Sequence, residues 1–244
     1  MQSNNPILTR VEVAGDYTQP MTVQGAVQKS VLLTVIAAVV GLGLFFYTFI
    51  TAQASIAYAG AIVGAIGGFI LALIATFKPN TARMLAIPYA LFEGAFLGGI
   101  SVIFQQKFPG VPLQALLATF VTTLVMFGLY RMQLIRATEK FKAVVMSASL
   151  AIAMVFVVQI VMNLAFGSSI PHLFESNWLG IGFAAFVAVI ASLNLILDFD
   201  LIESGAANYA PKAMEWVCAI ALLATLVWMY YSFLRLLGLI QGDD

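Results

Sequence analysis

Charged residues are scarce in this chain, and their scarcity decides its class. The sequence has 244 residues, of which 9% are charged and 62% are hydrophobic. A water-soluble domain usually has about 25% charged and about 45–50% apolar residues. This chain has too little polar surface to stay dissolved, so the composition predicts an integral membrane protein in contact with the lipid bilayer. Because 11 basic residues balance 11 acidic ones, the overall charge gives no reason to expect a nucleic acid as partner.

Cysteine and histidine are nearly absent as well. The one cysteine is Cys218 and the one histidine is His172, which excludes an intrachain disulfide, a redox pair and a His-rich or Cys-rich metal centre. The first 24 residues are polar and lack the basic start and short apolar core of a cleaved export signal. Residues 1–24 are therefore predicted to be a polar tail, and no organic cofactor is expected.

Long hydrophobic runs are what the chain does have. A helix needs about 20 apolar residues to cross a hydrocarbon core of about 30 Å. Seven runs reach or approach that length: 30–50, 54–77, 85–104, 112–130, 143–166, 178–197 and 213–234. The connections are too short for a second domain. Residues 25–240 are therefore predicted to form one all-α domain of seven transmembrane helices.

The basic residues are unequally divided between the two ends of these runs. The end shared with the N-terminus has nine, namely Arg10, Lys29, Lys78, Arg83, Arg131, Arg136, Lys140, Lys142 and Lys212. The other end has two, Lys107 and Arg235. Because Lys and Arg in short loops are retained in the cytoplasm, the N-terminus is predicted to be cytoplasmic. A G-protein-coupled receptor has the opposite orientation, and a retinal protein needs a lysine that the last run lacks.

Two further patterns predict local structure. Gly60, Gly64 and Gly68 repeat every four residues in the second run, and Gly94 and Gly98 do so in the third. This spacing favours close approach of helix backbones. The basic segment 131–142 is predicted to be a helical extension at the membrane interface.

Acidic residues inside the runs are the candidates for function, because an ionised carboxylate at membrane depth is costly. Glu93 lies in the third run, Asp198 and Asp200 follow the sixth, and Glu215 lies one turn into the seventh. All four belong to the predicted cytoplasmic side. Asn194 precedes Asp198 by four residues, so both share one helical face. Clustered carboxylates supply the oxygen ligands that Ca²⁺ prefers. Closely spaced carboxylates also cannot all ionise freely, so one of them keeps its proton to a higher pH than an isolated acid would. The simpler alternatives are a solvated loop after the sixth helix and, for Glu93, a hydrogen-bonded structural carboxyl.

Several of these residues lie in a set of distinctive segments: 197–203 (LDFDLIE), 214–216 (MEW), 224–230 (ATLVWMY), 234–237 (LRLL) and 92–98 (FEGAFLG). In these segments the chain resembles the Bax inhibitor-1 family, most of all its bacterial branch. The resemblance implies six helices around a central last helix, and a pH-sensitive, Ca²⁺-permeable leak. It also implies that Asp198 pairs with an aspartate in the last helix, but residues 222–229, which should supply it, are uncharged.

The hypothesis for the site joins these observations. Asp198, Glu215 and Glu93 are expected to form an acidic site for Ca²⁺ and protons, with Asp200 at its edge and Asn194 beside it. Asp198 and Glu215 are the expected metal ligands. Arg83 or Arg131 could neutralise the site as a basic latch.

Other classes of function remain open from the sequence. The resemblance offers a regulatory protein that binds a membrane-anchored protease. An intramembrane hydrolase is disfavoured, because the chain has no GxGD, GxSxG or zinc motif, so no enzyme activity is expected. Short loops and the lack of an organelle-retention signal favour a bacterial plasma membrane.

Overall fold

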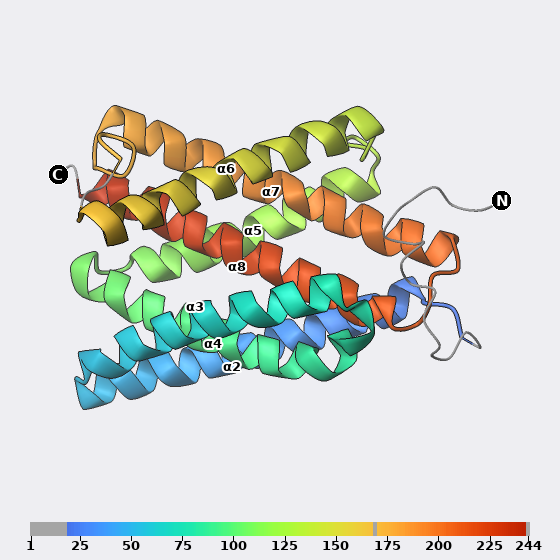
Figure 1. Cartoon of the computed structure of the whole chain (residues 1–244), viewed down its shortest axis with the longest axis horizontal. Helices are drawn as coiled ribbons and strands as arrows, with labels where there is room; N and C mark the ends of the chain where they lie inside the picture. The colour runs from blue at the N-terminus through green and yellow to red at the C-terminus, as the bar shows by residue number, and fades with distance from the viewer. Residues whose placement is uncertain (1–18, 168–169, 243–244) are drawn as a thin grey trace. The chain divides into compact units, whose positions relative to one another are not determined.

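The computed structural model describes residues 19–167 and 170–242. Its helices, labelled in Figure 1, are α2 (Val23–Thr51), α3 (Ala54–Phe77), α4 (Ala82–Lys107), α5 (Val111–Arg131), α6 (Glu139–Phe166), α7 (Trp178–Ala207) and α8 (Met214–Gln241). A short 3₁₀ turn, η1 (Pro79–Thr81), lies between α3 and α4. Within these ranges, seven helices are long and apolar enough to cross a membrane. The all-α prediction with seven spans is confirmed, and the chain is an integral, multi-pass membrane protein.

The sixth span is longer than its hydropathy predicts. α7 continues to Ala207, ten residues beyond the predicted end at Leu197. Charged side chains end the apolar run but not the helix, because Ile202 is buried in a core with Met21, Met214 and Cys218. Asp198, Asp200 and Glu203 therefore lie on a helix, and the alternative of a solvated loop after the sixth span is wrong.

The connection between α5 and α6 also differs from its prediction. The predicted helical extension over 131–142 is confirmed at residue 131 and at 139–142, but it is wrong for residues 132–138, which are not helical. α5 ends in a Schellman motif: Leu134 N–H donates to Leu129 O at 3.0 Å and Gln133 N–H to Tyr130 O at 2.9 Å. This motif turns the chain out of the helix through the left-handed Gln133, whose φ is 56°.

The chain divides into two compact units. One comprises Met1–Ile103 with Asp200–Ala224, and the other Phe104–Phe199 with Thr225–Asp244. The helices α7 and α8 each contribute to both. Among the seven described spans, the apolar part of α8 is the most buried and that of α6 the least.

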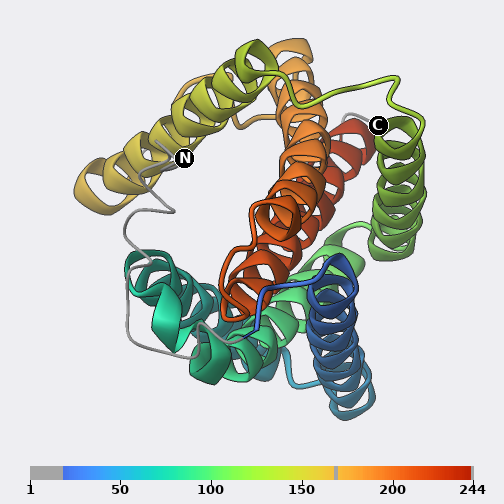
Figure 2. The same ribbon diagram turned by 90° about the vertical axis from the view of Figure 1, so that its right-hand side faces the viewer.

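In the first unit, α4 packs against α2 and α3 through the glycines whose spacing predicted close approach. A Cβ at Gly64 in α3 would lie 2.4 Å from Phe96 N of α4. A Cβ at Gly98 in α4 would lie 2.5 Å from Gly41 O of α2. No larger residue fits these contacts without movement, so the predicted role of the glycines is confirmed. In Figures 1 and 2, α2 (blue) runs beside α4 (green).

In the second unit, large side chains rather than glycines form the core. Ile152 of α6 packs with Val187 and Ile190 of α7, and Phe156, Phe183 and Trp228 surround them. Phe199 of α7 meets Phe127 and Tyr130 of α5, with ring centroids 5.6 and 5.8 Å apart.

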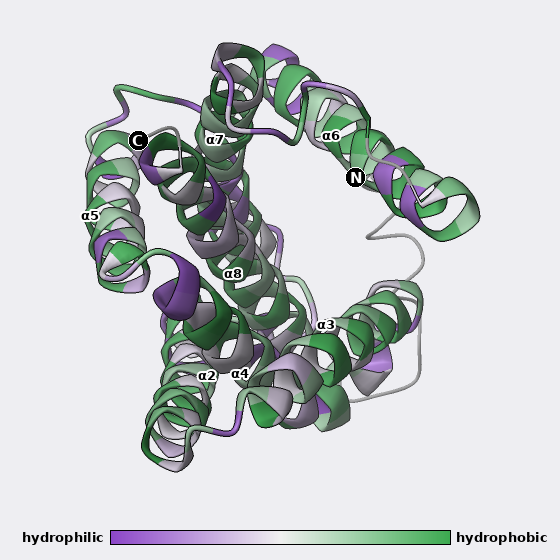
Figure 3. Cartoon of the chain, turned by 90° about the vertical axis from the view of Figure 1, so that its left-hand side faces the viewer, coloured by the Kyte–Doolittle hydropathy of each residue, from purple (hydrophilic) through white to green (hydrophobic). Residues whose placement is uncertain are grey.

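Apolar side chains also cover the outer surface of the helices. Hydrophobic colour dominates the helices in Figure 3. Large side chains such as Ile50, Leu164 and Phe166 are at least three-quarters exposed. A surface of this kind suits lipid chains, in agreement with the predicted bilayer contact.

Candidate functional site

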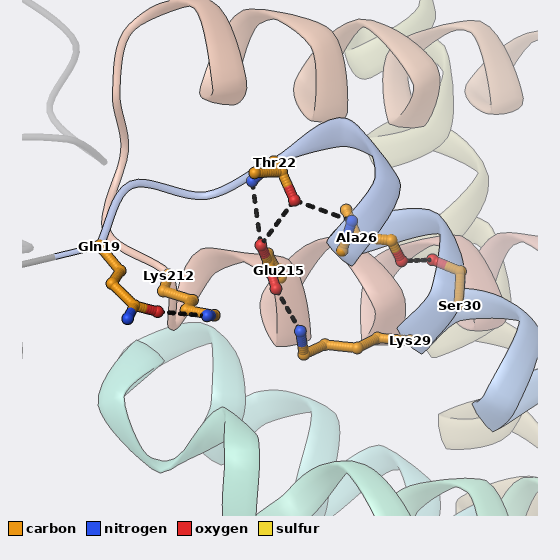
Figure 4. Close-up of polar contacts among 8 residues, drawn as sticks. Gln19, Thr22, Ala26, Lys29, Ser30, Lys212 and Glu215 are labelled. Atoms are coloured by element: carbon orange, nitrogen blue, oxygen red, sulfur yellow. Dashed lines mark hydrogen bonds and ion pairs between the residues drawn. The ribbon is translucent and has the colours of Figure 1, made fainter.

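Glu215 has the most complete set of partners among the candidate acids. It lies in the first turn of α8, and its side chain is 1% exposed. One carboxylate oxygen accepts hydrogen bonds from the Thr22 backbone N–H at 2.9 Å and from the Thr22 hydroxyl at 3.3 Å. The other oxygen forms an ion pair with the Lys29 ammonium group (Figure 4). Both oxygens of Glu215 are therefore engaged by donors.

The start of α2 is shaped to receive this carboxylate. Thr22 is the N-cap of α2, and its hydroxyl oxygen accepts from Gly25 N–H at 2.9 Å. The same hydroxyl donates to Glu215, so one side chain serves both helices. A Cβ at Gly25 would lie 2.3 Å from Glu215 Oε1, so glycine leaves the room that the carboxylate occupies. Lys29 also lies over the Trp216 ring, 5.2 Å from its centroid.

The segment before α2 is tied to the loop between α7 and α8. Met21 N–H donates to Ala210 O at 2.8 Å, and the Lys212 ammonium donates to Gln19 (Figure 4). The loop starts from a second Schellman motif, in which Tyr209 has φ 53° and Ala210 N–H donates to Gly205 O at 3.0 Å. A pocket of about 460 Å³ lies here and is lined by Thr22, Gln24, Gly25, Gln28, Lys29, Lys212 and Glu215.

Glu93 has its own partner on the same helix. It hydrogen-bonds with Tyr89, one turn earlier in α4, and Tyr89 is 1% exposed. A Cβ at Gly68 of α3 would lie 2.7 Å from Glu93 Oε1. The carboxylate therefore fills the space that Gly68 leaves, as a hydrogen-bonded structural carboxyl would.

Asp198 is the candidate acid with an unmatched oxygen. It lies on α7 in the second unit and hydrogen-bonds with Thr225 of α8. Its Oδ2 is buried and has no hydrogen-bond partner among the described residues. Asn194, one turn earlier, donates to Ser149 Oγ of α6 and to Ile190 O, both at 2.8 Å. The amide group of Asn194 is thus directed to α6, while Asp198 is bonded to α8.

The remaining candidate residues are less enclosed. Asp200 is half-buried on α7. Arg83 and Arg131, the expected latch residues, are both exposed, and the cation on Glu215 is Lys29. No local signal in the sequence identified Lys29 or Thr22 as partners of Glu215, because 186 and 193 residues separate them from it.

The groups around each acid determine whether it can bind Ca²⁺. No group of three or more His, Cys, Asp and Glu side chains gathers anywhere in residues 19–167 and 170–242. Ca²⁺ takes about six to eight oxygen ligands, whereas Glu215 faces an ammonium group and N–H and O–H donors. Asp198 Oδ2, by contrast, could supply one ligand.

Arg235, near the far end of α8, forms a separate buried cluster. It is 9% exposed and lies over three rings, with its guanidinium carbon 4.3 Å from the Phe174 centroid, 5.4 Å from Phe183 and 5.7 Å from Phe156. Its Nη2 donates to Leu173 O at 3.0 Å. This side chain fastens the α6–α7 loop to α6, α7 and α8.

Comparison with known proteins adds one match. A family model described as "Bax inhibitor 1 like" matches residues 5–242, almost the whole chain. No match was found among curated proteins or among solved structures.

Proposed function

The chain belongs to the Bax inhibitor-1-like family, and from this premise we propose that it is a pH-sensitive, Ca²⁺-permeable leak or transporter-like protein. In this proposal Ca²⁺ and protons are its ligands, the plasma membrane of a bacterium is its location, and it catalyses no covalent reaction. The carboxylates of the membrane-spanning helices are the groups that would meet the ions.

The observation that carries the proposal is the unmatched oxygen of Asp198. A buried polar atom without a partner is rare in a folded protein, and a carboxylate inside a membrane span is a functional candidate by default. Asp198 Oδ2 is such an atom. A lone carboxylate oxygen can take up either a proton or a hard cation. Competition between the two for Oδ2 would make the flux of Ca²⁺ depend on pH.

Thr225 gives this site its expected pH response. It belongs to the uncharged stretch 222–229, where the family resemblance implied a second aspartate, and its hydroxyl is the partner of Asp198. A hydroxyl does not titrate in the physiological range. We therefore expect one carboxylate to titrate here rather than a coupled pair. The flux should follow a transition of one proton, and Thr225→Asp should broaden that transition.

Glu215 has a different role in the proposal. Its two oxygens are held by Thr22 and Lys29, so it fastens the start of α2 to α8 instead of exchanging ions. In this role Lys29 is the basic residue that neutralises Glu215. Loss of Lys29 would leave the carboxylate with its two Thr22 donors but without its cation, which typically costs about 1–3 kcal/mol.

The test is Ca²⁺ flux from purified protein in liposomes, measured at a series of pH values. We expect Asp198→Asn to reduce the flux to that of protein-free liposomes and Glu215→Gln to reduce the stability of the protein. Glu93→Gln tests the third acid. Glu203→Gln, an exposed acid on the same helix as Asp198, is the matched control and should leave the flux unchanged.

Two results would contradict the proposal. Flux and pH response that survive Asp198→Asn would remove this residue from the ion path. A wild-type protein that passes no Ca²⁺, but co-purifies with a membrane protease and alters its turnover of substrate, would favour the regulatory function instead.

A further inference from the structure

The positive charge of this chain is balanced overall but concentrated locally. Residues 131–142, which we call the basic loop, contain Arg131, Arg136, Lys140 and Lys142, four of the 11 basic residues of the chain. The one acid in the basic loop is Glu139. Four positive charges and one negative charge give the segment a net charge of +3 between two membrane spans.

The fold presents this charge outward. The Schellman motif at the end of α5 turns the chain at Gln133, and Thr138 starts α6 by accepting from Phe141 N–H at 3.3 Å. Arg136 lies between these two ends, and Arg131 and Lys140 lie just outside them; all three side chains are exposed. Glu139 pairs with Lys142 at 3.4 Å, and Arg136 and Lys140 on either side of the start of α6 remain exposed.

Apolar side chains stand beside these cations. Met132 is 71% exposed and Leu134 is 66% exposed, although both lie in a loop rather than on the lipid-facing side of a span. Side chains of this kind, next to basic residues at the end of a transmembrane helix, are suited to the boundary between headgroups and acyl chains.

We propose that the basic loop binds the phosphate of anionic phospholipid headgroups, in the leaflet that the α5–α6 connection meets. Charge complementarity favours this partner, because basic residues next to a span lie within a Debye length of an anionic surface. The exposed Met132 and Leu134 favour a lipid over a free anion, which offers no apolar contact. A soluble polyanion would not need these two side chains.

The test compares lipid binding by the full chain in nanodiscs that contain a minority of phosphatidylglycerol in phosphatidylcholine. Native mass spectrometry gives the excess of phosphatidylglycerol retained by the protein. We expect an excess for the wild type and a fall of about fivefold in relative affinity for each basic residue removed. The double variant Arg136→Gln with Lys140→Gln should therefore lose about 25-fold.

Control variants distinguish lipid binding by the basic loop from the effect of basic residues elsewhere in the chain. Lys78→Gln removes an exposed basic residue from the α3–α4 connection and should leave most of the excess. Met132→Ser with Leu134→Ser should lower the affinity without changing the charge. Inorganic phosphate is the competitor that distinguishes the two sources of the anion, and it should not displace the lipid.

Two outcomes would overturn the proposal. One is an equal excess of phosphatidylglycerol for the wild type and for the Arg136 and Lys140 double variant. The other is displacement of the lipid by inorganic phosphate with no effect of the Met132 and Leu134 variant, which would indicate a site for free anions.

Discussion

At the scale of single residues, the chain uses buried charge to fasten segments that are distant in sequence. Glu215 connects α8 to the start of α2, and Lys29, its partner, is 186 residues away. Arg235 connects α8 to a loop in the second unit through Leu173 and three phenylalanine rings. Glu215 is matched by donors on both oxygens. Arg235 is covered by rings and donates through Nη2, but its Nη1 is buried without a hydrogen-bond partner among the described residues.

The contact between Gly25 and Glu215 gives a prediction with an internal control. We expect Gly25→Ala to lower the free energy of unfolding by about 1–2 kcal/mol, because the new Cβ would displace a carboxylate bonded to Thr22 and Lys29. Gly43 lies in the same helix, and a Cβ at that position would have no neighbouring atom within 4 Å. Gly43→Ala should therefore be neutral or stabilising by up to about 1 kcal/mol.

Unfolding of both variants in detergent micelles, followed by circular dichroism, measures this difference. Equal stability of the two alanine variants would show that the carboxylate of Glu215 moves aside without cost. The ion pair with Lys29 would then contribute little to the stability of the first unit.

The aromatic cluster around Arg235 gives a second prediction at this scale. We expect Arg235→Lys to speed hydrogen exchange in the described loop residues 170–177 and to destabilise the protein by about 1–2 kcal/mol. A lysine cannot lay a planar guanidinium on the Phe174 ring while it also bonds Leu173 O. Arg83→Lys, at an exposed position, is the matched control. Unchanged exchange in 170–177 would mean that the loop is held by other contacts.

At the scale of elements, helix ends depend on backbone geometry more than on hydropathy. α5 and α7 both end in Schellman motifs with a side chain in the left-handed position, Gln133 and Tyr209. Glycine is the usual residue there because it has no Cβ penalty. The sequence therefore has no glycine that would indicate either helix end. For α7, the charged residues after Leu197 predicted an end that was too early.

These helix ends can be tested by exchanging the residues. We expect Gln133→Gly to stabilise the protein by up to about 1 kcal/mol, since a left-handed conformation costs a side chain about that much. We expect Gly167→Ala, at the end of α6 where φ is 62°, to destabilise it by a similar amount. Thermal unfolding of the two variants in one detergent gives both values. Shifts of the same sign would show that helix propensity, not the end motif, dominates.

At the scale of the whole molecule, the sequence predicted what depends on local composition and missed what depends on distant pairing. The seven spans and the glycine contacts followed from hydropathy and from a spacing of four residues. The pairs Glu215–Lys29 and Asp198–Thr225 did not, because nothing within one helix specifies which residue of another helix faces it. The span pattern predicted that these acids lie at one side of the membrane. In the structure each has its own partner: Glu215 has Lys29, Glu93 has Tyr89 and Asp198 has Thr225.

The orientation in the membrane is a prediction for the whole molecule, based on nine basic residues at one end of the spans and two at the other. Cys218 is buried, so its replacement by Ser gives a background without cysteine. In that background we expect Ser176→Cys to react with a membrane-impermeant maleimide on intact cells. Asn80→Cys should react after the cells are opened. Both positions are exposed, so access to the reagent depends on the side of the membrane. The reverse pattern would place the N-terminus outside, and the basic loop would then face the outer leaflet.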